Sequence, residues 1–457
     1  MHKNTTDDNF SRGLAYLKSK NNKKAISEFN QVIARYPEKV EAYLNRAAAY
    51  GGNKDYERAF ADLNQALILD PNNATAYANR GNFHAECEEN ERAIEDFTKA
   101  IALNPTSSNY ISRAVAYSRV QNYEKAIEDA LQAERISPND EDVYLNCGVL
   151  NAMNLHYEKA IEYFNKMLGF NSKNPNAWFV RGFAYYCKED YAKAIEDLSE
   201  SINLFPHNAE TYNRRGSAYA MCDELEKAID DYTKALRINP NLADAYYNRG
   251  NAHARNGNHE RALYDHTKAI RLMENKEVAQ YSSDAYLNRG NTYFAMKDYE
   301  KALADFKRSF ELDPEYTEIF YKMGRTYYAM GDYKSAVENF TEVIRVFPEE
   351  EDLYYARGNA YGKMGDPFHA AGDFTKALAL NPEYAEAYCK RGIAYFEMED
   401  TERAAQEFNR AIALNPDYAE AYSKRGDVYA LNGEYEQALD DYNEARMLPL
   451  NDDIFGL

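Results

Sequence analysis

An alanine returns at a nearly constant interval along the chain of 457 residues. The interval is 34 residues, apart from one step of 33 and one of 40. A period in this range predicts a solenoid, in which small repeated units stack and bury their apolar faces against their neighbours. The repeats leave too little sequence for a separate catalytic domain. The alanines are Ala25, Ala59, Ala93, Ala126, Ala160, Ala194, Ala228, Ala262, Ala302, Ala336, Ala370, Ala404 and Ala438.

The repeat unit is clearest in residues 385–418, the twelfth copy, in which Ala385 is taken as position 1. Small and aromatic residues recur three and four positions apart, first at Tyr388, Gly392 and Tyr395 and again from Ala404 onward. This spacing predicts two helices with one apolar face each. An Asn-Pro pair near the end of the unit stops the second helix, because proline supplies no amide hydrogen.

Glycine occupies position 8 in eleven of the thirteen repeats, and tyrosine occupies position 11 in ten. A glycine inside a helix lets the backbone of a neighbour approach closely, to roughly 8 Å between axes. The simplest interpretation of the recurring tyrosines is that they belong to the core.

This pattern resembles the tetratricopeptide repeat, and the resemblance covers residues 6 to about 452 as thirteen units. It implies an all-α fold, a right-handed superhelical solenoid of antiparallel helix pairs. First helices would line a concave groove and second helices would form the outer wall. The resemblance also implies protein binding.

One insertion of six residues falls between repeats 8 and 9, within Glu274 to Ser282. Its helix formers predict a longer second helix in repeat 8, and a loop on the outer wall is the alternative. We expect an N-terminal array over residues 1–282, a C-terminal array over 283–452 and a short tail over 453–457.

The chain after the last helix lacks the extra polar helix that usually closes stacks of this family. A bare end would expose apolar surface. Either the tail folds back as a lid or the end docks to another molecule. The apolar tail residues are Leu450, Ile454, Phe455 and Leu457.

Bulk composition limits the partners and the compartment. The 54 basic and 74 acidic residues give a net charge of −20, which argues against a nucleic acid and favours a neutral or basic protein segment. Five scattered cysteines without a CxxC pair indicate neither disulfides nor a zinc site. No leader-like apolar stretch and no run of 18 apolar residues is present. We therefore expect a cytoplasmic protein without membrane insertion.

Asparagines mark the predicted groove at positions 6 and 9 of the first helices, although asparagine is a poor residue for a helix interior. An amide can donate to and accept from one peptide unit, so such a row could hold an extended backbone. The row resembles the one in the repeat domain of O-GlcNAc transferase, without its catalytic domain. The alternative is that the asparagines arose by duplication and bind water. They are Asn45, Asn79, Asn82, Asn146, Asn248, Asn251, Asn288, Asn291 and Asn359.

Aromatic residues beyond the shared core form a second candidate set on the first helices. In a desolvated groove they would anchor partner side chains. The alternative is that they pack against the adjacent repeat. The set consists of Phe179, Phe183, Tyr186, Phe294, Tyr321, Tyr328 and Tyr355.

Three further patterns have structural interpretations. Arginine at position 7 recurs in eleven repeats, and we expect it to bridge to carboxylates of second helices such as Asp96 or Glu196, with a phosphate-binding row as the alternative. Acidic residues at position 2 would stabilise the N-termini of the first helices and line one edge of the groove. Repeat 8 places His253 and His266 where aromatic residues normally pack, and we expect core histidines rather than metal ligands.

No nucleophile, base and orienting residue converge, and no Gly-rich phosphate loop is present, so we expect no enzyme activity and no cofactor. The sequence predicts a protein-interaction scaffold or adaptor that binds an extended partner segment in the groove. The alternative is a structural solenoid that forms homo-oligomers through its C-terminal face.

Overall fold

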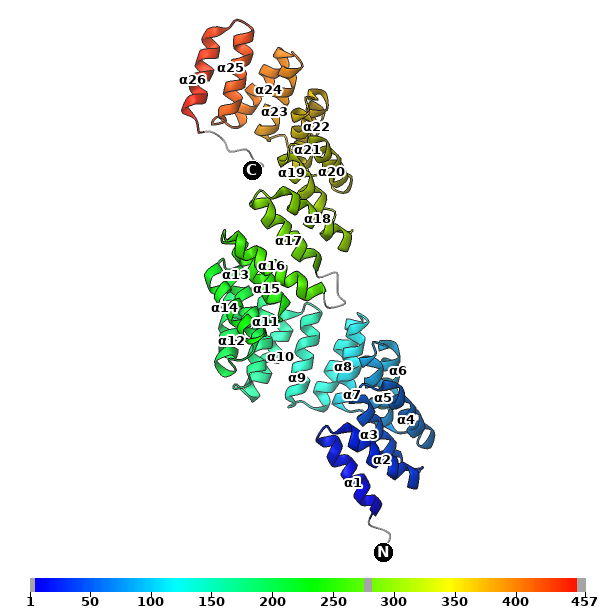
Figure 1. The fold of residues 1–457 in the computed structure, drawn as a ribbon. Coiled ribbons are helices and arrows are strands. Elements are labelled where there is room, and N and C mark those ends of the chain that lie inside the picture. The colour runs from blue at the N-terminus through cyan, green and yellow to red at the C-terminus, as the bar shows by residue number, and fades with distance from the viewer. Residues whose placement is uncertain (1–4, 275–281, 450–457) are drawn as a thin grey trace. The chain divides into compact units, whose positions relative to one another are not determined.

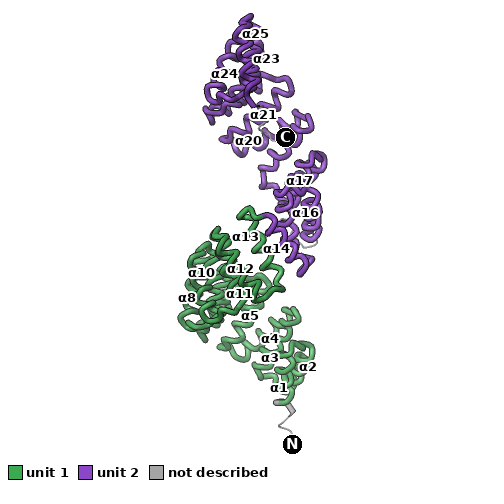
Figure 2. Tube along the Cα trace, turned by 90° about the vertical axis from the view of Figure 1, so that its left-hand side faces the viewer, with its two compact units in different colours: residues 1–224 green, residues 225–457 purple. Residues whose placement is uncertain are grey.

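The computed structural model describes residues 5–274 and 282–449, and these residues form 26 helices and no strand. They divide into two compact units, residues 1–224 and 225–457, which are coloured separately in Figure 2. The boundary predicted after residue 282 stays a prediction. Residues 275–281 and the apolar tail residues from 450 to 457 lie outside the described residues. The predictions about the insertion, a longer helix or a loop, and about the tail as a lid concern these residues.

The first unit contains helices that follow one another as pairs joined by short turns (Figure 1). They are α1 (Thr5–Lys18), α2 (Asn22–Arg35), α3 (Val40–Gly51), α4 (Tyr56–Leu69), α5 (Ala74–Glu86), α6 (Asn90–Leu103), α7 (Ser107–Arg119), α8 (Tyr123–Ile136), α9 (Glu141–Met153), α10 (Tyr157–Phe170), α11 (Pro175–Cys187), α12 (Tyr191–Leu204) and α13 (Ala209–Met221).

The second unit continues the same alternation. Its helices are α14 (Leu225–Ile238), α15 (Ala243–Arg255), α16 (His259–Glu274), α17 (Ser282–Ala295), α18 (Tyr299–Leu312), α19 (Ile319–Ala329), α20 (Tyr333–Val346), α21 (Glu351–Lys363), α22 (Pro367–Leu380), α23 (Ala385–Glu397), α24 (Thr401–Leu414), α25 (Ala419–Leu431) and α26 (Tyr435–Met447). The expected all-α fold of antiparallel helix pairs is confirmed.

The periodic alanines and the position-8 glycines bring the two helices of a repeat into close contact. Ala404 is fully buried, and a Cβ atom added at Gly392 would lie 2.7 Å from Cε1 of Phe408 on the second helix. The same close approach joins Gly81 to Phe97, at 2.9 Å. The glycines are therefore required by packing, because any larger residue would displace the aromatic ring beneath it.

A left-handed residue makes the turn inside each repeat. The turn residue of the twelfth repeat is Glu399, with a φ of 62°, and that of the thirteenth is Gly433, with a φ of 82°. The left-handed conformation reverses the chain within a few residues after the first helix. Only four of these turns use glycine, at Gly257, Gly331, Gly365 and Gly433.

The arginine at position 7 ties three helices together. Arg80 on α5 donates from Nε and Nη2 to both carboxylate oxygens of Asp96 on α6, at 2.8 and 2.7 Å. Its Nη1 donates to Oδ1 of Asn64 on α4, at 2.7 Å. Asp96 is 4% exposed, so its charge is compensated where little water reaches it. Arg80 thus joins its own pair and links that pair to the preceding repeat, whereas Arg12 of the first repeat bonds to Glu28 of its own pair.

The same arrangement recurs along the chain and corrects one expected pairing. Arg181 donates to Asp197 at 2.7 and 2.8 Å and not to Glu196, which is exposed one residue earlier on α12. Carboxylates on the second helices thus account for these guanidinium groups, as the structural interpretation required. The other bidentate partners are Arg46 with Asp62, Arg113 with Asp129, Arg249 with Asp265, Arg289 with Asp305, Arg357 with Asp373, Arg391 with Glu407 and Arg425 with Asp441.

Removing one carboxylate of this series tests its contribution to stability. We expect Asp197→Ala to lower the free energy of unfolding by about 3 kcal/mol, because Arg181 would stay desolvated without its partner. Urea denaturation followed by circular dichroism measures the change. Glu196→Ala is the matched control, and an equal loss in the two variants would contradict the assignment.

A substitution at Gly392, where the two helices of a repeat approach closely, tests the packing. We expect Gly392→Ala to destabilise the protein by about 1 to 3 kcal/mol, because its methyl group would overlap the ring of Phe408. Phe408→Leu in the same chain should recover part of the loss, since Leu198 already faces Gly182 in repeat 6.

Gly372 on α22 provides the control for this substitution. No atom lies within 4 Å of the place that its Cβ would take. Gly372→Ala should be neutral or stabilising by up to about 1 kcal/mol, because alanine favours the helix. Thermal unfolding curves of the two alanine variants that coincide would overturn the packing argument.

Candidate partner-binding face

The predicted groove residues lie on the first helices of the repeats. In the first unit the asparagines lie on α3, α5 and α9, and the aromatic residues lie on α11. In the second unit the asparagines lie on α15, α17 and α21, and the aromatic residues lie on α17, α19 and α21. The first helices α3 and α5 contact each other, as do α15 and α17.

Two of the asparagines use their amide nitrogen within their own helix. Nδ2 of Asn45 donates to the carbonyl oxygen of Glu41 at 2.7 Å, and Nδ2 of Asn146 donates to that of Asp142 at 2.7 Å. Each bond uses one of the two amide hydrogens and fixes the side chain against its own helix. The side-chain oxygen and the second amide hydrogen stay available to a partner.

Four other asparagines keep both amide groups available. No side-chain hydrogen bond is found for Asn79, Asn82, Asn291 or Asn359 within residues 5–274 and 282–449. Asn82 is exposed, and the other three are half-buried. These side chains can donate and accept without breaking a bond of the fold.

Asn251 and Asn288 belong to a polar network in repeats 8 and 9 instead. Nδ2 of Asn288 donates to the phenol oxygen of Tyr247 at 2.8 Å, and Oδ1 of Asn251 lies 3.0 Å from Nε2 of His266. Tyr247 is also hydrogen-bonded to Asn251. The half-buried Asn248 lies on the same helix, α15. The unusual histidine at position 24 was the sequence signal for this network. Tyr247 was missed, because its partner Asn288 lies in the next repeat, 41 residues away.

His266 confirms the interpretation as a core histidine. It is fully buried, and a Cβ at Gly250 would lie 2.5 Å from its Cδ2. Burial, with a smaller contribution from the charge of Arg289, lowers the pKa of His266 to about 4. Among the described residues no group of three or more His, Cys, Asp and Glu side chains is arranged to hold a metal ion.

The aromatic set of repeat 6 forms a small cluster. The rings of Phe183 and Tyr186 stack with centroids 6.4 Å apart, and Tyr186 also meets Tyr191 on α12 at 5.5 Å. The guanidinium group of Arg214 on α13 lies 4.8 Å above the ring of Phe183. Part of this cluster therefore packs against the adjacent repeat. Phe179, one helical turn before Phe183, is half-buried.

The second aromatic set is engaged in packing to different degrees. Phe294 meets Tyr299 at 5.5 Å and lies under Arg325, at 5.3 Å. The ring centroids of Tyr328 and Tyr333 are 5.3 Å apart.

Two tyrosines of this set lie deeper. Tyr321 packs against Phe340 of the core at 5.9 Å. Tyr355 is only 4% exposed and packs between Phe374 and Tyr384. Its ring gives almost no surface to a partner, so we leave Tyr355 out of the binding face proposed below.

A cavity of about 410 Å³ opens at the N-terminal ends of α19 and α21. Glu318, Glu350 and Asp352 stand at its edge, and Phe347 and Leu353 form part of its apolar lining. Its residues also include Tyr321 and Lys322, and burial followed by the charge of Arg325 lowers the pKa of Lys322. Carboxylates above an apolar floor suit the stem and charged end of a lysine or arginine side chain.

Comparisons with known proteins agree with the repeat geometry. Models described as "TPR repeat" or "Tetratricopeptide repeat" match residues 10–74, 74–107, 107–140, 175–208, 222–257, 243–276, 283–316, 324–365, 351–384, 374–406 and 394–433. The chain belongs to the tetratricopeptide repeat family. An architecture of such repeats is typical of non-catalytic protein-interaction scaffolds.

A search of solved structures found matches that include the following three. The APC/C hetero-tetramer Cut9-Hcn1 is 15% identical, covering 93% of this chain and 96% of that chain with a TM-score of 0.43. MamA is 26% identical, covering 35% and 92% with a TM-score of 0.33. YrrB, described as "a TPR protein with an unusual peptide-binding site", is 24% identical, covering 39% and 92% with a TM-score of 0.33.

Likeness at this level says nothing about the partners of this chain. No curated protein matched the sequence. Among the described helices, none is both long enough and apolar enough to cross a membrane.

The buried histidine gives a pH-dependent prediction. Between about pH 6.5 and pH 4 the unfolded chain binds a proton that folded His266 does not, so stability falls as the pH is lowered through this window. The loss by pH 4 is on the order of 3 kcal/mol. Urea midpoints at several pH values measure it.

His266→Phe restores the aromatic residue found at this position in other repeats and should flatten the pH dependence. His207→Phe, at an exposed histidine, should leave it unchanged. A steep loss of stability that persists in His266→Phe would show that another group is responsible.

Proposed function

We propose that this tetratricopeptide repeat protein is a non-enzymatic scaffold or adaptor whose first helices bind an extended segment of a partner protein. The observation that carries the proposal is the set of amides at Asn79, Asn82, Asn291 and Asn359. These side chains make no hydrogen bond to any other residue that the structure describes. Each can donate to a peptide carbonyl and accept from a peptide N–H.

Asparagines with and without a hydrogen bond to their own helix would make different contacts with the backbone of a partner segment. Asn79 and Asn82 lie three residues apart on α5 and would bind a peptide unit on one helix face. Asn45 on the adjacent α3 would add an acceptor through its side-chain oxygen, while one of its amide hydrogens is bonded to the carbonyl oxygen of Glu41. Such contacts favour an extended segment with little regard to its side chains.

A preference for particular side chains of the partner would come from aromatic and acidic groups of this protein. The half-buried rings of Phe183 and Phe294 offer apolar contact area beside the cations Arg214 and Arg325. The acidic cavity between α19 and α21 favours a lysine or arginine of the partner. The net charge of −20 would steer neutral to basic segments toward the protein.

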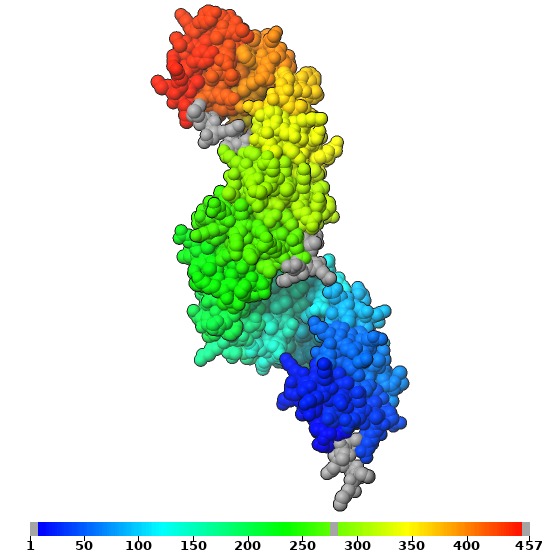
Figure 3. Space-filling model, in the orientation of Figure 1, coloured from blue at the N-terminus to red at the C-terminus, as the bar shows by residue number. Residues whose placement is uncertain are grey.

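Self-assembly is the second candidate function, and the surface of α26 favours it. Tyr435, Leu439 and Met447 are 74%, 60% and 86% exposed, although Ile161 and Leu303, which correspond to Leu439 in earlier repeats, are buried. All three residues lie on α26, in the part of the chain coloured red in Figure 3. Arg446 stands where most earlier repeats have an aliphatic residue, such as the buried Ile202 and Leu378. The arginine makes the face less apolar and places this candidate second.

A capture experiment tests the scaffold. The variant Asn79→Ala, Asn82→Ala, Asn291→Ala and Asn359→Ala should lose a partner that wild type captures from native lysate, by about tenfold or more. Asn203→Ala with Asn443→Ala, at exposed asparagines of second helices, is the matched control and should capture as wild type does. Mass spectrometry quantifies the captured proteins.

Two outcomes would contradict the proposed face. Equal capture by wild type and the first-helix variant would show that the amides are not used. Capture of the bait alone, together with a mass in light scattering that rises with concentration, would favour self-assembly.

A further inference from the structure

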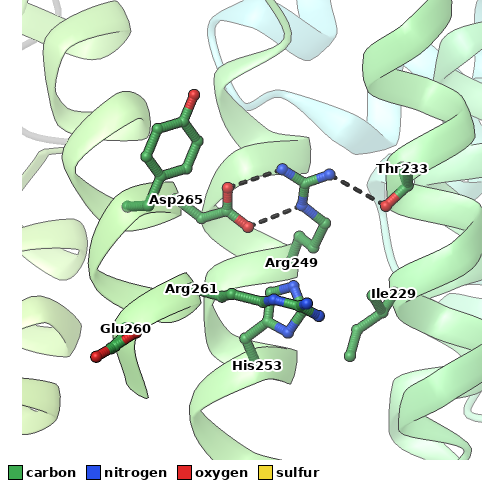
Figure 4. A pocket seen from close by; sticks show the side chains of 8 residues that line it. Ile229, Thr233, Arg249, His253, Glu260, Arg261 and Asp265 are labelled. Atoms are coloured by element: carbon green, nitrogen blue, oxygen red, sulfur yellow. Dashed lines mark hydrogen bonds and ion pairs between the residues drawn. The ribbon is translucent and has the colours of Figure 1, made fainter. Parts of the chain in front are cut away.

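The arginine at position 7 joins two neighbouring repeats, and Arg249 shows the full set of contacts. It donates to both carboxylate oxygens of Asp265 in its own repeat, at 2.7 and 2.8 Å, and to the hydroxyl oxygen of Thr233 in the preceding repeat, at 3.0 Å (Figure 4). Thr233 stands at position 25 of its repeat. An asparagine takes the same role elsewhere, since Oδ1 of Asn409 accepts from Arg425 at 2.7 Å. Position 25 of one repeat and position 7 of the next thus form a recurring pair.

Repeat 1 and repeat 13 each hold one member of this pair. Arg12 stands at position 7 of repeat 1, and its Nη2 donates to Glu28 of its own pair at 3.2 Å. Its Nη1, the atom that reaches the preceding repeat elsewhere, donates to Asp8 on the same helix instead. Asn443 stands at position 25 of repeat 13, is exposed and makes no side-chain hydrogen bond to another described residue. The donor and the acceptor of one further junction are therefore present on two separate surfaces.

Positions 21 and 10 form an apolar pair across a junction. Ile161 at position 21 of repeat 5 packs in one buried cluster with Ala184 at position 10 of repeat 6. The residue at position 21 of repeat 13 is Leu439, which is 60% exposed. Position 10 of repeat 1 is the exposed Ala15, which is small enough to accept a leucine as Ala184 accepts Ile161. The two surfaces therefore match in apolar contact as well as in hydrogen bonding.

Positions 28 and 3 form a third pair, which is apolar at most junctions. Ile344 at position 28 of repeat 10, for example, packs in one buried cluster with Leu353 at position 3 of repeat 11. Both members are charged in the two end repeats, because position 28 of repeat 13 is Arg446 and position 3 of repeat 1 is Asp8. Both residues are exposed. Opposite charges thus stand at the two positions that would meet if repeat 1 of one molecule followed repeat 13 of another.

The net charges of the two end repeats are complementary too. Residues 5–39, which contain repeat 1, have seven Lys and Arg residues and four Asp and Glu residues. Helix α26 has four acidic residues and a single arginine. Attraction between a basic surface and an acidic one raises the rate at which two molecules meet and favours one relative orientation.

We propose that repeat 1 of one molecule docks on α26 of a second molecule and continues the stack from copy to copy. Arg446 would bind Asp8 of the other molecule, which releases Nη1 of Arg12 to donate to Asn443. Leu439 would be covered at the same junction. The contact joins two different surfaces, so it produces a ring or an open filament rather than a symmetric dimer. The proposal rests on self-assembly, the second function considered above, and adds the surface that α26 would contact.

Exchange of the two charges in the full chain tests the proposal. Asp8→Arg and Arg446→Asp each place like charges at the junction, and we expect each to weaken self-association by about tenfold or more. The double variant restores an opposite pair and should recover most of the lost affinity. An equimolar mixture of the two single variants should do the same, because each end of one variant is then opposite in charge to the matching end of the other. Analytical ultracentrifugation over a range of concentrations measures the association.

Two controls separate this interface from other effects of charge and from the scaffold. Glu128→Arg with Lys376→Asp makes the same charge changes at exposed residues of α8 and α22 and should associate as wild type does. Asn443→Ala should weaken self-association and leave the capture of a partner unchanged. The quadruple first-helix asparagine variant should show the reverse. Circular dichroism of each variant shows that it is folded.

Three results would overturn the proposal. Self-association that is unchanged in both single variants would keep self-assembly as a function but exclude this interface. Loss of association in the single variants without recovery in the double variant would show that the two charges do not meet. A wild type that stays monomeric would exclude self-assembly altogether, and assembly only after deletion of residues 450–457 would show that the tail covers α26 instead.

Discussion

The stack depends on one guanidinium group in most repeats. Helix pairs packed only through alanine, glycine and aromatic residues could adopt several registers. Small residues fix the distance between two helix axes better than they fix the position of one helix along the other. The arginine at position 7 removes this freedom by bonding to a carboxylate of its own repeat and to an amide or hydroxyl oxygen of the preceding one, as Arg249 does with Asp265 and Thr233. A charge so enclosed is tolerated only when each of its donors is satisfied.

The fold could be predicted from the sequence because the same spacing of small and aromatic residues occurs in thirteen successive repeats. Pairings were harder to predict, since neighbouring residues on a helix differ in direction by about 100°. That difference separates the buried Asp197 from the exposed Glu196. The network of Asn251, Asn288 and Tyr247 joins two repeats, so no pattern within one repeat could reveal it.

The two histidines at position 11 show how copies of one unit diverge. His84 is closed over by Phe60 and Glu89, whereas His253 borders a cavity. The difference lies in neighbouring residues rather than in the histidine itself. The same residue at the same position of the repeat is therefore enclosed in one copy and borders a cavity in another.

Two repeats lack the arginine, and each unit contains one of them. Cys147 stands in its place on α9 and donates to the carbonyl oxygen of Ala130, while the buried Met323 stands there on α19. Near Cys147 another ion pair joins the two repeats, because Glu134 on α8 accepts from Lys166 and Tyr163 on α10 at 2.6 and 2.9 Å. Near Met323 the contact is aromatic, with Phe310 against Phe320 at 5.0 Å. The link between neighbouring repeats is therefore kept where the arginine is lost, by different chemistry in each unit.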